Sequence, residues 1–220
     1  MISYRKLIPC IYIAGGKAIK WFNDREVLAD NVVELAKHYS DRGADELLIF
    51  DLSDSDDDHE ASLNLLRQIH NVISIPMVAG GNIKRMEDVQ RILYSGAKRV
   101  ILNFSKPDSA EMMAKAAERF GKEKVAVSLD DFDGLFKHQH LIEDNCSQLI
   151  FMHRLDLNSI MNVTDVPCVI ITDTEEESEL FKILKCPGVR GLSGRYVSRT
   201  DIDCVAFKDK CTEEGIKMTS

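Results

Sequence analysis

The sequence lacks long apolar runs and an excess of positive charge. No uninterrupted apolar stretch reaches the about 18 residues that suggest a membrane-spanning helix, and no signal peptide opens the chain. We therefore expect a cytoplasmic protein with no membrane partner. The formal net charge is −8. Because a nucleic-acid groove needs concentrated positive charge, no nucleic-acid partner is expected, whereas backbone amides at helix starts can still bind phosphorylated small molecules.

The sequence also lacks paired cysteine motifs. Its six cysteines show no CxxC spacing, and several lie in expected strands or helices. This pattern predicts buried thiols in a reducing compartment rather than a disulfide framework or a zinc site. The cysteines are Cys10, Cys146, Cys168, Cys186, Cys204 and Cys211.

What the sequence does contain is an alternation of short apolar runs with helix-period stretches. Several runs are continuously apolar, as in residues 47–50 and 169–171, which is typical of parallel strands covered on both faces. The eight runs begin near Leu7, Glu46, Ile75, Arg99, Lys124, Gln148, Cys168 and Val189, and the helical stretches are 32–42, 61–71, 86–95, 109–120, 175–184 and 203–214. The pattern predicts one α/β domain over residues 1–220, a compact (βα)8 TIM barrel.

A weak internal repeat supports the barrel. Residues 75–78 match residues 166–169, each with proline in second place, as two half-barrels in tandem would produce; chance similarity between strand-rich segments is the alternative. Residues 134–161 are the least regular part, so the fifth and sixth units are expected to be shortened. Such barrels usually take about 250 residues.

Candidate binding groups follow the third and fourth runs. Gly80 and Gly81 end the third run, and paired glycines let backbone N–H groups approach an anion closely. Asn103 and Ser105 follow the fourth run and can add side-chain donors. These residues predict a phosphate cradle at the carboxyl ends of the strands, where barrels carry their sites. A tight βα turn explains the glycines equally well.

Four stretches, 8–20, 45–52, 75–83 and 97–103, resemble the histidine-biosynthesis barrels. The likeness is closest to the cyclase subunit of imidazole glycerol phosphate synthase, with its sister isomerase next. The chain also looks similar to the reduced barrel at the amino end of some bacterial proteins. The later domains of those proteins are phosphoribosyl-AMP cyclohydrolase and phosphoribosyl-ATP pyrophosphohydrolase.

The resemblance implies a bisphosphorylated ribulosyl aminoimidazole ligand with one phosphate on each half of the barrel mouth. By position, one phosphate would be held by Gly80, Gly81, Asn82, Asn103 and Ser105. The other would be held after strand eight, where this chain has Ser193, Gly194 and Arg195. Asp173 and Glu175, after strand seven, would repel that phosphate unless an arginine compensates. Binding of this second phosphate is therefore expected to be weaker.

The resemblance also implies two catalytic aspartates, acting as general acid and base. The strand-five position holds Asp130, but the strand-one position holds Tyr12, a phenol with a reference pKa of about 10. Cyclisation is therefore expected to be impaired. Asp51 and Lys20 also match family positions and could orient a ligand; the alternatives are a helix or loop cap for Asp51 and a solvated charge for Lys20.

Two clusters suggest metal sites, but neither is favoured. The acidic run at residues 54–60 is typical of a helix N-terminus as well as of a hard-cation site. His138 and His140, with His153 as a third ligand, could hold a transition metal, although loop histidines usually bind none. No metal and no cofactor are expected. Trp21 and Phe22 are interpreted as a lid packed on the barrel mouth, with a subunit or domain contact as the alternative.

Two functional hypotheses follow. The first is an active cyclase or isomerase that uses Asp130 as general acid or base. The second, which we favour, is a ligand-binding or organising barrel with lost cyclase chemistry, fused to or associated with other histidine-pathway domains. A glutaminase partner cannot be inferred from the sequence.

Overall fold

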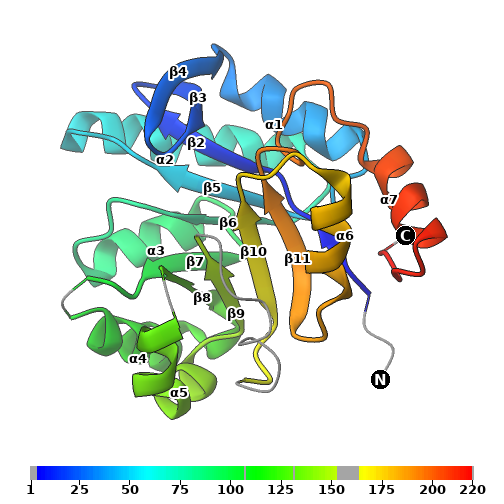
Figure 1. Cartoon of the computed structure of the whole chain (residues 1–220). Helices are drawn as coiled ribbons and strands as arrows, with labels where there is room; N and C mark the ends of the chain where they lie inside the picture. The colour runs from blue at the N-terminus through cyan, green and yellow to red at the C-terminus, as the bar shows by residue number, and fades with distance from the viewer. Residues whose placement is uncertain (1–3, 107, 131, 153–163, 220) are drawn as a thin grey trace.

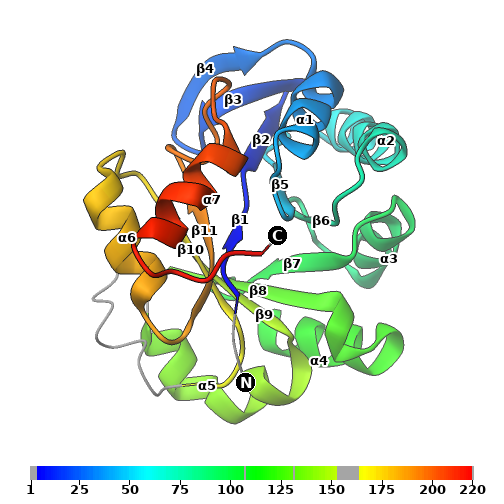
Figure 2. The same ribbon diagram turned by 90° about the vertical axis from the view of Figure 1, so that its right-hand side faces the viewer.

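The computed structural model of the chain describes residues 4–106, 108–130, 132–152 and 164–219 (Figure 1). Within these ranges the chain forms a curled, mostly parallel sheet surrounded by helices, as Figures 1 and 2 show. The parallel strands are β1 (Lys6–Leu7), β2 (Cys10–Ala14), β5 (Leu47–Asp51), β6 (Met77–Gly80), β7 (Arg99–Asn103), β8 (Val125–Leu129), β9 (Gln148–Phe151), β10 (Cys168–Thr172) and β11 (Val189–Gly194). The predicted (βα)8 barrel is confirmed.

The barrel closes through a first strand that is broken at Pro9. β1 pairs with β11, and β2 pairs with β5, so the two ends of the sheet meet at this one segment of chain. Pairing continues across the break, because Ile8 N donates to Leu192 O at 2.9 Å and Leu48 N donates to Pro9 O at 3.0 Å. Proline lacks only the N–H, so its carbonyl still joins the ladder.

The continuous apolar runs are explained by burial on both faces of the sheet. Leu48, Val78 and Ile101 belong to a cluster that fills the barrel interior. Leu47 and Ile49, from the same strand as Leu48, pack in the outer cluster between sheet and helices. Burying such a side chain contributes about 1.5–3 kcal/mol, so both layers favour this register.

Seven α-helices lie outside the sheet in the described residues (Figure 2). They are α1 (Val32–Asp41), α2 (Asp56–Val72), α3 (Met86–Tyr94), α4 (Ser109–Phe120), α5 (Phe132–Asn145), α6 (Glu177–Lys185) and α7 (Cys204–Glu213), with a short 3-10 turn, η1 (Lys122–Lys124). α2 begins earlier than the sequence pattern predicts, because Ser55 caps it and accepts from Asp58 N at 3.1 Å. The acidic run supplies the first turn, where the helix dipole favours carboxylates.

Two expectations about the loops need correction. The first βα loop is a β-hairpin, β3 (Lys17–Trp21) and β4 (Asp24–Ala29), that extends the sheet from β2. The fifth unit is not shortened: α5 spans 14 residues, although His138 has non-helical angles and kinks it. The sixth unit follows β9 and falls at 153–163, outside the described residues.

The repeated proline segments have the same place in the two halves of the barrel. Pro76 O accepts from Leu47 N of the preceding strand at 2.9 Å, and Pro167 O accepts from Leu149 N of the preceding strand at 2.9 Å. The duplicated sequence pattern thus corresponds to a duplicated backbone contact, as tandem half-barrels would give.

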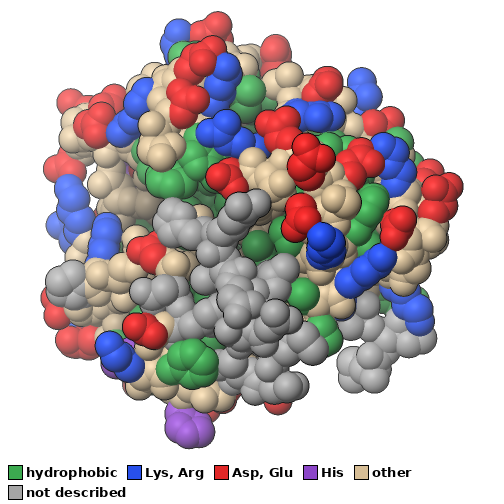
Figure 3. All heavy atoms as spheres, in the orientation of Figure 1, with side chains coloured by type: hydrophobic (Ala, Val, Ile, Leu, Met, Phe, Trp, Pro, Cys, Tyr) green, Lys and Arg blue, Asp and Glu red, His purple; other side chains and the backbone are tan. Residues whose placement is uncertain are grey.

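Charged side chains of both signs are interspersed over the face shown in Figure 3, and hydrophobic side chains gather just below the β3–β4 hairpin. The six cysteines are free thiols, five of them buried and Cys186 half-buried. None of the helices in the described ranges has the length and apolar character to cross a bilayer.

Candidate functional site

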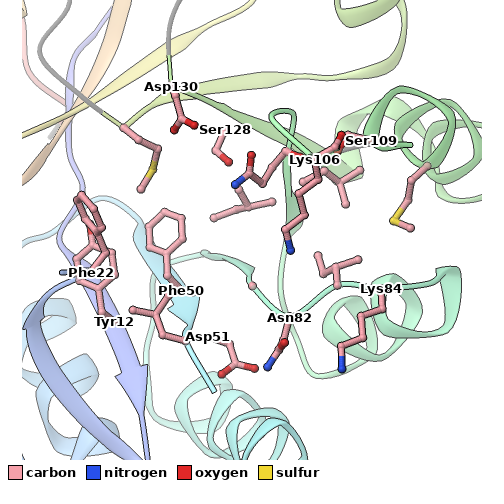
Figure 4. Close-up of a pocket in the computed structure, with 18 of the residues that line it drawn as sticks. Tyr12, Phe22, Phe50, Asp51, Asn82, Lys84, Lys106, Ser109, Ser128 and Asp130 are labelled. Atoms are coloured by element: carbon pink, nitrogen blue, oxygen red, sulfur yellow. Dashed lines mark hydrogen bonds between the residues drawn. The ribbon is translucent and has the colours of Figure 1, made fainter. Parts of the chain in front are cut away.

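A cavity of about 630 Å³ opens at the carboxyl ends of β2, β5, β6, β7 and β8, with Met152 after β9 on one side (Figure 4). Its size suits a small-molecule ligand. One part of its wall is aromatic and aliphatic, and the other part is polar. The lining residues are Tyr12, Phe22, Phe50, Asp51, Leu52, Gly81, Asn82, Ile83, Lys84, Ile101, Leu102, Asn103, Lys106, Asp108, Ser109, Met112, Ser128, Asp130 and Met152.

Gly81 is required by the backbone at the end of β6. Its φ is +105°, and a Cβ there would lie 2.0 Å from Asp51 O. Gly80 is buried, and a Cβ there would lie 2.4 Å from Ile101 O; it does not line the main cavity. Both glycines therefore allow close strand packing, which agrees with the tight-turn interpretation, while only Gly81 also borders the cavity. Asn82 borders it too, with its side-chain amide donating to Ser53 O at 2.8 Å.

A hydrogen-bond chain joins the loops after β7 and β8. Ser105 Oγ donates to Asp130 Oδ2 at 2.7 Å, and Ser105 N donates to Asn103 Oδ1 at 2.8 Å. Asn103 and Asp130 line the cavity, whereas Ser105 lies in the adjoining pocket beside α5. The Asp130 side chain is solvent-exposed at the rim, so it can reach a ligand without a large desolvation cost.

Sequence reasoning missed two lysines that line the cavity. Lys84 pairs with Asp56 at 3.0 Å, and Lys106 forms no ion pair within the part of the chain that the structure describes. In Figure 4 the Lys106 ammonium is directed toward the loop that carries Asn82. Each lysine follows a strand end in a βα loop, which was the one available signal, but loop lysines are usually solvated charges.

Asp51 is held by the protein rather than left open to a ligand. Its carboxylate accepts from Ser62 Oγ at 3.0 Å, from Ser53 N at 3.0 Å and from Ser53 Oγ, and the His59 Nδ1–H donates to it at 2.5 Å. These contacts tie β5 to α2; the one from Ser53 N fits a loop cap, whereas the N-cap of α2 is Ser55. The residue still borders the cavity.

Tyr12 is buried inside an aromatic cluster. Its ring stacks on Phe50 with centroids 5.3 Å apart and meets Trp21 edge-on at 5.5 Å, while Phe22 completes the cluster. Its hydroxyl is buried with no hydrogen-bond partner of normal geometry among the described residues. Burial, and next the neighbouring Cys10 thiol, raise the pKa of Tyr12 well above its usual value. The expected lid is therefore packed into the barrel mouth, with Trp21 almost fully buried.

The other predicted ligand contacts are not brought into the cavity. Lys20 pairs with Glu26 at 2.7 Å within the hairpin. Ser193 is fully buried, and Gly194 has φ +117° with no room for a Cβ, which would lie 1.9 Å from Thr172 O. The Arg195 guanidinium lies over the Trp21 ring at 5.4 Å.

No group of three or more metal-ligating side chains comes together among residues the structure describes. His138 packs edge-on against Phe104 at 5.3 Å, and Asp56 of the acidic run is paired with Lys84. His153, the third suggested ligand, lies outside the described residues.

Comparison with known proteins agrees with the barrel fold. The profile of the family described as "Histidine biosynthesis protein" matches residues 6–177. The chain is 35% identical over 130 residues to the imidazole glycerol phosphate synthase subunit HisF of Tolumonas auensis, over 58% of this chain and 50% of that protein. The match thus spans half the length of this relative. The chain belongs to the histidine biosynthesis protein family.

Proposed function

We propose that this barrel binds a phosphoribosyl or ribulosyl aminoimidazole compound in the strand-end cavity and has lost most of the cyclase chemistry of its relatives. The position of Tyr12 carries the proposal. Where the resemblance implies a carboxylate facing Asp130, the chain has a phenol buried against Phe50 and Trp21.

Phosphate binding is supported by the polar wall of the cavity. Lys106 provides a cation that is not neutralised by a described side chain, and Gly81 lets backbone approach closely. The first turn of α4 receives no side-chain hydrogen bond from its cap, Asp108. Amides in such a turn attract anions, and the helix dipole adds to the attraction.

The loss of cyclase chemistry follows from acid–base considerations. The resemblance implies that ring formation uses two groups near neutral pH, one as general acid and one as general base. Asp130 provides one. Because the pKa of Tyr12 is raised well above its usual value, its phenol stays protonated near neutrality. Tyr12 therefore cannot serve as the general base.

The alternative is an active cyclase or isomerase that relies on Asp130. Its support is that Asp130 lies on the cavity rim, exposed and oriented by Ser105. A single positioned carboxylate can serve alternately as base and acid, so this alternative needs a direct test.

The test is to titrate a ribulosyl aminoimidazole bisphosphate by calorimetry and to measure its turnover with ammonia. We expect saturable binding and a rate equal to the buffer blank. A rate above the blank that disappears in Asp130→Asn would establish the alternative. Absence of binding would overturn the proposal.

We further propose that the chain acts in the cytoplasm beside other histidine-pathway domains, of the cyclohydrolase and pyrophosphohydrolase kind. The support is the combination of free thiols with a filled strand-one position. Sequencing the gene beyond Ser220 tests the fusion, because a stop codon directly after it would contradict a fused arrangement at this end.

A further inference from the structure

The cavity has two walls of different chemistry. On one side Phe22 and Phe50 present rings, and in Figure 4 the Phe50 ring points into the cavity. On the other side Lys106, Asn82 and Ser109 present polar groups. A ligand that satisfies both walls must itself carry an anionic end and a planar apolar part.

Within the described residues, the part of the barrel mouth between β3 and the end of β11 is filled. Trp21 reaches from β3 into the interior cluster, where it packs on Tyr12, and Arg195 covers its ring. Ser193 and Gly194 are buried and do not border the cavity. Within the described residues, the ends of β10 and β11 therefore offer no second anion site that is continuous with the cavity.

The charges around the cavity also argue against a second phosphate. Lys84 is already paired with Asp56, which leaves Lys106 as the unpaired cation among the described lining residues. The carboxylates of Asp108 and Asp130 also line the cavity. Among the described residues, a second phosphate would approach the Asp108 carboxylate with no further unpaired lining cation to offset it, and like charges in a partly enclosed site repel strongly.

We infer that the cavity is specific for a ligand with one phosphate and one planar heteroaromatic ring, and that a second phosphate adds nothing to affinity. The phosphate lies against Lys106 and the start of α4, and the ring stacks on Phe22 and Phe50. This inference rests on the proposed function and narrows it to the phosphoribosyl end of the ligand class.

Four probes separate the contributions of the phosphate, the ring and a second phosphate to affinity. They are 5-aminoimidazole-4-carboxamide ribonucleotide, its nucleoside, ribose 5-phosphate, and a ribulosyl aminoimidazole bisphosphate. Affinity is measured by calorimetry, and the fluorescence of Trp21, the single tryptophan, reports contact with the aromatic wall. We expect the ribonucleotide to bind at least about tenfold more tightly than ribose 5-phosphate, as one base–aromatic stack provides. The bisphosphate should bind within about threefold of the ribonucleotide, since one phosphate is held in both.

Variants assign each part of the ligand to a wall. Phe22→Leu and Phe50→Leu keep an apolar side chain but remove the ring, so they should weaken the ribonucleotide and leave ribose 5-phosphate unchanged. Lys106→Met should weaken every phosphorylated probe. Lys115→Met, on the exposed face of α4 where Lys115 pairs with Glu111, is the matched control and should change none.

The outcomes distinguish this inference from the proposed function. If no phosphorylated probe binds, both fail. If ribose 5-phosphate binds as tightly as the ribonucleotide, only the inference fails. A bisphosphate that binds about a hundredfold more tightly than the ribonucleotide, with the advantage lost in Arg195→Ala, would show a second phosphate grip and overturn the inference.

Discussion

The rings of Tyr12 and Phe50 stack at an interplanar angle of 18°, joining the ends of the first and second barrel strands. This contact places the strand-one side chain in an aromatic cluster with Trp21 and Phe22. Tyr12 and Phe50 both border the cavity, which opens at the carboxyl ends of β2 and of β5 to β8. Stacked and edge-on aromatic pairs add about 0.5–1.5 kcal/mol beyond burial, so the cluster is a stable element of the fold.

Replacing Tyr12 with aspartate should not restore cyclisation. The carboxyl would be buried among Trp21, Phe22 and Phe50, and we expect a loss of about 2–4 kcal/mol in the free energy of unfolding. Urea denaturation and a turnover assay with ammonia check both parts. Tyr12→Phe is the matched control: it removes a buried hydroxyl that has no hydrogen-bond partner among the described residues, so stability should stay equal or rise by up to about 1 kcal/mol. Measurable turnover in Tyr12→Asp would show a dormant catalytic site.

Asp51→Asn should lower stability by about 1–3 kcal/mol, because the amide cannot accept from all of the donors on α2 and the β5–α2 loop. Binding of 5-aminoimidazole-4-carboxamide ribonucleotide should change little, since the carboxylate is occupied within the protein. Thermal melts and calorimetry measure the two effects. Asp130→Asn, at an exposed site, provides the comparison for stability and should be near neutral. A variant Asp51→Asn that is fully stable and fails to bind would contradict the structural role.

Gly81→Ala should cost about 2 kcal/mol or more in stability, because the new Cβ would meet the Asp51 backbone at a left-handed φ of +105°. Gly15→Ala is the matched control. Gly15 also has a positive φ, +55°, but nothing lies within 4 Å of an added Cβ, so only the backbone penalty of about 1 kcal/mol remains. Denaturant melts of the two variants give the difference. Equal losses would show that the loop relaxes around the methyl group.

Stability should fall as the pH rises above about 9. Burial raises the pKa of Cys146 and of Cys168 from 9.0 to about 12. Between these values the unfolded thiol ionises while the folded thiol keeps its proton, so the unfolded state is favoured by about 1.4 kcal/mol per pH unit for each group. Below about pH 8 these thiols give no pH dependence. Denaturant melts under reducing conditions from pH 7 to 10.5 measure the slope. Cys168→Ala should reduce the slope by the contribution of one thiol, about 1.4 kcal/mol per pH unit. An unchanged slope would contradict the raised pKa of Cys168.

The barrel itself was predictable because its signals are local. Strands buried on both faces appear as continuous apolar runs, as at residues 47–50, and glycines end the strands where backbones approach closely. The start of α2 was placed too late, because the prediction relied on the apolar periodicity. Ser55 caps the helix ahead of that periodicity, so α2 begins before its hydrophobic face does.

Position alone placed Gly81, Asn103 and Asp130 near one another, since the carboxyl ends of parallel strands share one rim. The sequence by itself determined this barrel, its rim and the absence of a carboxylate at Tyr12. Only the tertiary structure decided that Trp21 folds into the mouth, that Asp51 turns toward α2 and that Lys106 faces the cavity. The direction of a side chain at a strand end depends on neighbours distant in sequence, whose packing and hydrogen bonds no local pattern encodes.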